Sequence, residues 1–328
     1  MTHLNIHPNM QQTNMNKYPA PAKINTHLLV EGLNAKGMHL LHTGFIYVDL
    51  SDQLYIKPAE HIIVSCSNEA FSGEKNLVFK VLEALRSKHG ILQGLHVHIE
   101  KHIPDQAGLG GGSSDAATAL MVANQLWNLQ ISMQDMITFA TPFGADIPCF
   151  LFSQASFARN VGDHLQKNPW IDKEPRLTNG FVCLSRPKHG LSTRSVFEHF
   201  DAIHALTQES GADTMRADSL RDAFIGLDLR PEKYSLAYPY LGQNALEASA
   251  ATLLPELNAL LDELKASGLP AWMSGSGSTC VALCTTQEEA SVLARTLTAK
   301  HLADWTYVGK LLTKHPMQGE ENWDVAKR

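Results

Sequence analysis

The chain contains little cysteine, and what it has is scattered. Five thiols occur in 328 residues, an odd number at wide spacing and without a CxxC pair: Cys66, Cys149, Cys183, Cys280 and Cys284. This pattern disfavours both a disulfide framework and a structural zinc site. Reduced thiols in the cytoplasm are therefore the expectation.

Long apolar runs and excess positive charge are also missing. No apolar run is long enough to span a membrane, and the polar segment 1–17 lacks the apolar core of a secretory signal. The formal net charge of −6 disfavours a nucleic acid or an anionic membrane as partner. A small anion is still compatible, because local backbone donors can bind it.

What remains is the composition of an ordinary globular protein, with 44% hydrophobic and 18% charged residues. The predicted strands and helices do not alternate regularly, which favours an α+β fold over a doubly wound parallel sheet. A polar stretch at 160–180, punctuated by Gly, Asn and Pro, predicts a domain boundary. We therefore expect tails at 1–17 and 315–328, with domains at 18–165 and 166–314.

The local patterns predict the following elements. Strands are expected at 24–30, 45–50, 54–57, 61–66, 95–101, 181–185 and 281–284, with short ones near Trp272 and Val308. Helices are expected at 76–90, between Asn76 and Gly90, and at 132–140, 244–266 and 287–299. The segment "FGADIPCFLF" (143–152) is interpreted as a turn leading into an apolar strand.

One stretch concentrates glycine ahead of a helical pattern: "IPDQAGLGGGSSDAATAL" (103–120). The N–H groups in the first turn of a helix lack intrahelical partners and carry partial positive charge, so they bind phosphate well. Glycines let the backbone approach such a ligand closely. Ser113 is predicted to cap the helix, and the Ser114 hydroxyl is a candidate contact for phosphate or magnesium.

Known phosphate loops do not fit this stretch. A P-loop needs a Lys after the glycines, and none follows; the third glycine of a dinucleotide fingerprint is replaced by Ser113. A nucleophile elbow is absent as well. The alternative is a flexible turn capped by serine, which is disfavoured because so many glycines cost backbone entropy.

The order "PDQAGLGGGSSDAA", starting at Pro104, resembles the ATP-binding signature of the GHMP kinases. Three further segments resemble the 4-diphosphocytidyl-2-C-methyl-D-erythritol kinase family: "PAPAKINTHLLVEGLNAKGMH" (19–39), "FGADIP" (143–148) and "SGSGST" (274–279). Their order and spacing agree with that family. The resemblance extends from about residue 18 to about residue 312.

This resemblance implies a two-domain fold, with a ribosomal S5 domain 2-like N-terminal domain and a ferredoxin-like C-terminal domain. It implies ATP-dependent phosphorylation of the 2-hydroxyl of 4-diphosphocytidyl-2-C-methyl-D-erythritol in the non-mevalonate route to isoprenoid precursors. Transfer would be direct, Mg²⁺ would accompany ATP, and the protein would be a monomer or homodimer. The ATP-binding residues would be Pro104, Asp105, Gln106, Ala107, Gly108, Leu109, Gly110, Gly111, Gly112, Ser113 and Ser114.

The same resemblance assigns Asp146 as general base and Lys23 as its partner. Asp146 lies in an apolar segment, an unusual place for a merely solvated charge. From the residues alone, Asp146 could equally be a turn residue beside a glycine, and Lys23 a surface residue on an edge strand.

The resemblance further implies substrate contacts from Asn25, Met38, His39, Thr193 and Phe197. Met38 departs from the family, which usually has Tyr there, and it cannot hydrogen-bond through a hydroxyl. Phe197 could stack on a base or simply belong to a helix core.

Two alternative functions stay open: a GHMP kinase acting on another small alcohol, and a catalytically silent nucleotide-binding homologue. A metal site at His96, His98 and His102 is disfavoured against a solvated strand face. The sequence assigns no metal ligand other than the candidate Ser114 hydroxyl.

Overall fold

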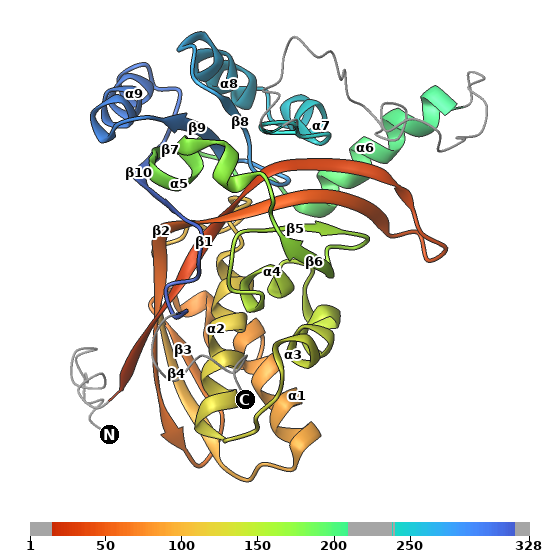
Figure 1. Ribbon diagram of the computed structural model, residues 1–328, viewed down its shortest axis with the longest axis vertical. Helices are drawn as coiled ribbons and strands as arrows, with labels where there is room; N and C mark the ends of the chain where they lie inside the picture. Colours follow the sequence, from red (N-terminus) through yellow and green to blue (C-terminus); the bar gives the residue numbers. More distant parts are fainter. Residues whose placement is uncertain (1–14, 209–237, 239, 319–328) are drawn as a thin grey trace, which may run out of the picture.

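The computed structural model describes residues 15–208, 238 and 240–318. Figure 1 shows two lobes along the longest axis, joined by a long curved hairpin. The hairpin consists of β1 (Asn16–Leu33) and β2 (His39–Ala59). Three strands predicted in this region are parts of these two. The chain remains paired because a register shift after Pro21 absorbs the extra residues between Val48 and Ser51.

The described strands form a ten-stranded sheet. Its main path runs β3 (Ile63–Cys66), β4 (Gly94–Glu100), β2, β10 (Trp305–Leu312), β7 (Phe181–Arg186), β9 (Cys280–Cys284) and β8 (Ala271–Met273). Two short strands, β5 (Ser156–Arg159) and β6 (His164–Lys167), extend it beside β2. Only β3 and β4 pair in parallel within this described sheet. The α+β class is confirmed.

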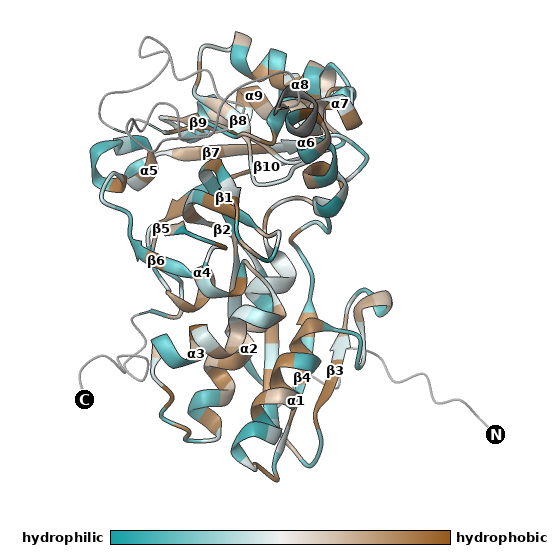
Figure 2. Cartoon of the chain, turned by 90° about the vertical axis from the view of Figure 1, so that its right-hand side faces the viewer, coloured by the Kyte–Doolittle hydropathy of each residue, from teal (hydrophilic) through white to brown (hydrophobic). Residues whose placement is uncertain are grey.

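Helices cover both lobes. The N-terminal lobe carries α1 (Leu77–His89), α2 (Gly111–Leu126), α3 (Met133–Ala140) and α4 (Ile147–Leu151). The C-terminal lobe carries α5 (Pro175–Asn179), α6 (Thr193–Gln208), α7 (Glu247–Leu253), α8 (Glu256–Ala266) and α9 (Gln287–Ala299). In Figure 2 the helices show both teal and brown residues, as expected where one face packs and the other meets water.

Several local predictions are confirmed. Helix α1 begins after Asn76, whose side chain accepts from Val78 N, and it ends at Gly90 in the left-handed region. In β4 the alternating residues Leu95, Val97 and Ile99 are fully buried. Helix α9 spans the predicted 287–299.

Two of the predicted elements are wrong, and both involve proline. The apolar segment after Asp146 is helix α4 rather than a strand, because Pro148 suits a first helical turn and cannot donate in a sheet. The predicted long helix at 244–266 is interrupted at Leu254, whose ψ of 84° is not helical. The residue before a proline, here Pro255, is disfavoured in the helical region.

The β1–β2 hairpin contributes to every part of the core. Phe45 packs with the residues of α1 and α2, Ile24 packs with Trp272, and Leu28 packs with α7 and α8. The described ends are packed too: β1 begins at Asn16, and His315 is buried. Most of the two predicted tails, 1–14 and 319–328, lies outside the described residues.

Candidate active site

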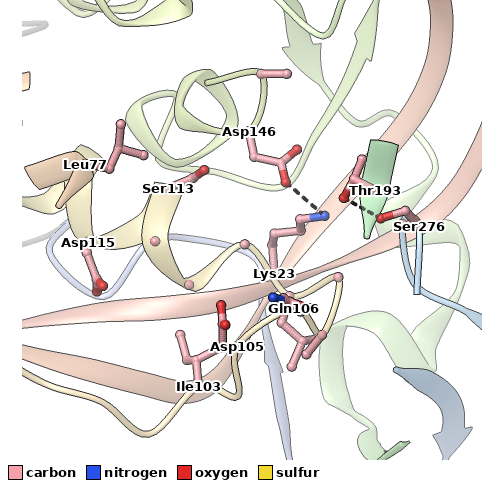
Figure 3. Close-up of a pocket in the computed structure, with 18 of the residues that line it drawn as sticks. Lys23, Leu77, Ile103, Asp105, Gln106, Ser113, Asp115, Asp146, Thr193 and Ser276 are labelled. Atoms are coloured by element: carbon pink, nitrogen blue, oxygen red, sulfur yellow. Dashed lines mark hydrogen bonds and ion pairs between the residues drawn. The ribbon is translucent and has the colours of Figure 1, made fainter. Parts of the chain in front are cut away.

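A cavity of about 640 Å³ lies between the two lobes. Figure 3 shows its walls: the glycine-rich loop, β1, the segment before α4 and the first residue of α6. The predicted residues that line it are Lys23, Asn25, Pro104, Asp105, Gln106, Ala107, Gly108, Leu109, Gly110, Gly111, Gly112, Ser113, Asp146, Thr193 and Phe197. Segments far apart in the sequence therefore meet here.

The glycine-rich loop opens directly into α2. Gly110 occupies the N-cap position with φ of 72°, and no side chain caps the helix. The prediction that Ser113 caps α2 is therefore wrong, because Ser113 already lies in the first turn. Its side chain instead faces the cavity. The uncapped end leaves N–H groups of the first turn available for a ligand.

Ser114 differs from the other residues predicted to bind ATP. It is fully buried and does not belong to the cavity lining. Its hydroxyl has no hydrogen-bond partner within the described part of the chain. The structure thus presents the hydroxyl of Ser113, rather than that of Ser114, to the cavity.

A second glycine loop, 274–279, packs on the first. The Ser274 hydroxyl donates to Gly108 O at 3.3 Å, and Thr279 N donates to Ala107 O at 3.3 Å. A Cβ atom at Gly108 would lie 2.5 Å from Ser274 O, and Gly108 has φ of 72°. Only glycine satisfies both conditions. The two loops therefore fix each other's backbone across the lobes.

Lys23 and Asp146 form an ion pair in the cavity. Lys23 Nζ lies 3.4 Å from Asp146 Oδ2, with the lysine side chain 3% and the aspartate side chain 39% exposed. Lys23 Nζ also donates to Asn25 Oδ1 at 2.7 Å, and Lys23 N donates to Leu109 O at 3.0 Å. Lys23 is therefore not a surface lysine. The pair presents an accessible carboxylate beside a buried cation.

At the other end of the cavity, the first turns of α6 meet the second glycine loop. The hydroxyls of Thr193 and Ser276 lie 2.8 Å apart and share a hydrogen bond (Figure 3). Phe197 lines the cavity and also packs on His39, with ring centroids 4.4 Å apart. His39 Nε2 lies 2.7 Å from Asp201 Oδ1. His39 and Met38 do not line the cavity, and Met38 is 45% exposed.

Sequence reasoning missed a second charged cluster, made of Asp52, Lys101 and Asp115. Lys101 Nζ binds Asp52 and lies 2.9 Å from Asp115 Oδ2. Asp52 Oδ1 also accepts from the backbone N–H groups of His102 and Ile103. Burial raises the pKa of Asp115 to about 8; Lys101 opposes this change and Asp52 adds to it. Asp115 stands in the glycine-rich signature, but no local motif marks Asp52 or Lys101. The pairing of β2 with β4 brings these two together, and the start of α2 adds Asp115.

Apolar residues that the sequence did not indicate also line the cavity. They are Phe71, Leu77 and Ile103, next to Asn76 and Lys75. In the described residues, no group of three or more His, Cys, Asp or Glu side chains could hold a metal ion. Nor does any helix in that part combine the length and the hydropathy needed to cross a membrane.

The comparisons with known proteins agree with this architecture. Residues 76–154 match the family model "GHMP kinases N terminal domain", and residues 232–304 match "GHMP kinases C terminal". A 4-diphosphocytidyl-2-C-methyl-D-erythritol kinase of Acidovorax ebreus is 33% identical over 81% of this chain and 87% of its own length. The enzyme of that name from Bordetella pertussis is 33% identical over 86% of both chains.

Solved structures give the same result. A crystal structure of 4-(cytidine 5'-diphospho)-2C-methyl-D-erythritol kinase superposes with a TM-score of 0.68 at 28% identity, covering 90% of this chain and 99% of the other. Mevalonate kinase from Methanococcus jannaschii shares the fold, with a TM-score of 0.61 at 13% identity over 93% and 100% of the two chains. The protein is thus a small-molecule kinase that uses ATP, and it belongs to the 4-diphosphocytidyl-2-C-methyl-D-erythritol kinase family of the GHMP kinases.

Proposed function

We propose that the protein transfers the γ-phosphoryl group of ATP to the 2-hydroxyl of 4-diphosphocytidyl-2-C-methyl-D-erythritol, in the cytoplasm. The family places the protein among kinases of isoprenoid synthesis. The observation that carries the proposal is the Lys23–Asp146 pair, which lies 3.4 Å apart in the same cavity as the uncapped end of α2. That arrangement supports the proposal, because Asp146 would act as a base near a phosphate site.

The phosphates of ATP would lie at the N-terminus of α2. Gly110, Gly111 and Gly112 allow close approach, and the free N–H groups of the first turn favour negative charge. The apolar residues Phe71, Leu77 and Ile103 in the cavity wall would contact the base of the nucleotide, because apolar walls suit an aromatic ring. ATP would then extend from α1 to the ion pair.

Asp146 would act as the general base. The substrate oxygen forms a bond to the γ-phosphorus, the bond between that phosphorus and the β,γ-bridging oxygen breaks, and ADP leaves. The hydroxyl proton passes to the Asp146 carboxylate. Lys23, whose ammonium group lies beside this carboxylate, would offset the negative charge that spreads over the transferred group.

Magnesium would arrive with ATP and neutralise phosphate charge. The cavity wall near the start of α2 carries a hydroxyl and a carboxylate group. Both offer oxygen atoms, which are the ligands that Mg²⁺ prefers. Ser113 would be the nearest hydroxyl, since its side chain faces the cavity while Ser114 is buried.

The acceptor would lie between the ion pair and α6. Thr193 and Ser276 offer hydroxyls at this end, and Asn25 lies beside Lys23. Phe197 would provide an aromatic face for the cytosine ring, and His39 packs directly against that side chain. Met38 does not line the cavity, so it would contact only a part of the substrate that extends beyond the cavity.

ADP release tests the proposal. Purified protein with Mg²⁺ and ATP should release ADP only when the cytidyl substrate is present, and phosphorus NMR should show a new phosphomonoester. Homoserine and mevalonate serve as alternative acceptors in the same assay. Activity on one of them, without activity on the cytidyl substrate, would reject the proposed acceptor. No activity with any acceptor, despite ATP binding, would favour the silent homologue.

A further inference from the structure

The Lys23 ammonium group is held by a chain of buried hydrogen bonds that begins on β2. Lys23 Nζ donates to Asn25 Oδ1 at 2.7 Å, and Asn25 Nδ2 donates to Thr43 Oγ1 at 2.8 Å. Thr43 Oγ1 in turn donates to the backbone oxygen of His27 at 2.6 Å. Lys23, Asn25 and Thr43 are each no more than 3% exposed. We call this chain of bonds the Thr43 relay.

The direction of every bond in the relay is fixed by chemistry. A backbone oxygen can only accept, so the Thr43 hydroxyl must spend its one proton on His27 O. Thr43 Oγ1 can then only accept from Asn25, which requires the NH₂ end of the amide. The oxygen end must therefore face Lys23, and an ammonium group, which only donates, requires an acceptor there.

The reverse amide orientation would be costly. It would aim the NH₂ group of Asn25 at the Lys23 ammonium and leave two donors in contact in a buried place. Without the Thr43 hydroxyl, nothing in the relay would select between the two orientations. Thr43 thus decides which end of Asn25 faces the cation.

The anchor points of the relay are rigid. Thr43 lies in the interior of the sheet, since β2 pairs with Leu28 on one side and with Ala158 on the other at this position. The backbone of Asn25 is held from the opposite lobe, because Trp272 Nε1 donates to Asn25 O at 2.7 Å and Asn25 N donates to Ser274 Oγ at 3.1 Å. Asn25 is thus held through its backbone and, by Thr43, through its side chain. A residue held in this way can position an ammonium group with the accuracy that catalysis needs.

Space around the relay is also limited. A Cβ atom at Gly275 would lie 3.1 Å from Asn25 Oδ1 and 3.5 Å from Lys23 Nζ. The second glycine loop therefore closes over the amide and the ammonium together. Among the described residues, Lys23 Nζ has two acceptors, Asn25 and Asp146, at 2.7 and 3.4 Å.

We infer that Thr43 is a positioning residue for phosphoryl transfer. By fixing the orientation of the Asn25 amide, it holds the Lys23 ammonium group beside Asp146. The inference rests on the proposed function, in which that ion pair moves the proton and offsets phosphate charge. It also gives Asn25 a role in positioning Lys23 rather than only in contacting substrate.

Replacing the hydroxyl while keeping the shape tests this inference. Thr43→Val should lower kcat about 10- to 100-fold, the effect of a catalytic group displaced by about 1 Å. The KM values for ATP and for the cytidyl substrate should stay nearly unchanged, because the lost interaction acts in the transition state. Thr43→Ser, which keeps the hydroxyl, should restore most of the turnover.

Thr118→Val is the matched control. Thr118 is fully buried in α2, and its hydroxyl has no partner within the described chain, so this variant removes an equally buried hydroxyl that does not belong to the relay. It should keep the turnover of the parent protein. Melting temperatures are measured for every variant, and Thr43→Ala is used if Thr43→Val does not fold.

A second readout does not depend on activity. In protein labelled with ¹⁵N-lysine, the ammonium signal of Lys23, assigned with Lys23→Arg, should exchange slowly with water in the parent protein, in Thr43→Ser and in Thr118→Val. In Thr43→Val or Thr43→Ala it should broaden or disappear. If the parent protein does not phosphorylate the cytidyl substrate, the proposed function fails, and this signal alone then decides on the relay.

Four results would overturn the inference, and the first three are normal turnover in Thr43→Val, a rise in KM in place of the fall in kcat, and an unchanged Lys23 signal. A fall in turnover as large in Thr118→Val would overturn it too, because general packing would then explain both.

Discussion

Two lysines in the same cavity meet carboxylates in different ways. Lys101 binds two buried aspartates, and Asp52 is further satisfied by two backbone N–H groups. Lys23 meets one aspartate at a longer distance, 3.4 Å, and that aspartate is 39% exposed. The two aspartates of the first cluster, Asp52–Lys101–Asp115, are buried, although Lys101 and Asp115 lie at the cavity wall, whereas the second pair leaves a carboxylate open to a ligand.

This difference separates a structural role from a chemical one. Both carboxylate oxygens of Asp52 are in hydrogen bonds, which leaves this group little capacity to accept a proton from a substrate, while a carboxylate with free lone pairs can accept one. The number of carboxyl groups beside each lysine differs as well, since Lys101 pairs with two and Lys23 with one. Three changes in these two groups and a fourth at an exposed ion pair test the comparison.

The largest effect is expected at the open pair. Asp146→Asn should lower turnover by about 10²- to 10⁴-fold, because the amide cannot accept the hydroxyl proton. ATP binding, measured by calorimetry, should be nearly unchanged. Asp172→Asn, at an exposed carboxylate outside the cavity, is the control and should have the parent turnover. Full activity in Asp146→Asn would remove Asp146 from the mechanism.

The next effect concerns stability at the enclosed cluster. Lys101→Met removes the only cation of the cluster and leaves Asp52 and Asp115 buried next to each other. Breaking a buried pair in this way costs about 3–5 kcal/mol. Urea unfolding at pH 7.5 should show this loss as a lower midpoint. A variant as stable as the parent would mean that water reaches the cluster freely.

A smaller and pH-dependent effect is expected at Asp115. Its pKa in the folded protein is about 8, above the ordinary value of 3.8, so the folded state holds its proton more tightly than the unfolded state. The parent protein should therefore lose stability at this group as pH rises from about 4 to about 8.

Asp115→Asn removes this dependence, since the amide stays neutral and leaves Lys101 paired with Asp52 alone. The melting temperature of the variant should thus rise relative to that of the parent between pH 5 and pH 8. A difference that does not change with pH would show that Asp115 is ionised throughout this range.

The smallest effect is expected at an ion pair on the surface. Arg295 and Glu288 lie 3.0 Å apart on α9, with side chains 67% and 77% exposed. Glu288→Gln should change the free energy of unfolding by no more than about 0.5 kcal/mol, because solvent and salt screen such pairs. A larger loss in urea unfolding would mean that the distance between the charged atoms, rather than their burial, determines how much an ion pair stabilises the protein.

The sequence allowed the open pair to be predicted and not the enclosed cluster. Lys23 and Asp146 each stand in a short segment whose residue order resembles a known family, so each could be assigned without a three-dimensional structure. Asp52, Lys101 and Asp115 meet because β2 pairs with β4 and α2 packs above them. Contacts set by strand register leave no periodic or local pattern in the sequence. Thr43 escaped prediction for the same reason.

The fold shows a similar division. Elements with a clear period and clear ends were predicted, such as α1 between Asn76 and Gly90. The short apolar segment after Asp146 was not, because a few apolar residues in a row suit a strand or a helix equally. Pro148 was the available signal, and its position in the first helical turn shows why it should outweigh hydrophobicity there.

The long β1–β2 hairpin limits how such a protein can be divided or recombined. Leu28 packs in the core of the C-terminal lobe, Phe45 packs in the core of the N-terminal lobe, and Ile24 packs with Trp272 between them. A C-terminal half expressed alone would expose the surface that the hairpin covers, so we expect it to aggregate. Exchanging lobes between relatives would in turn need the first sixty residues to match both partners, which ties the two halves to a shared evolutionary history.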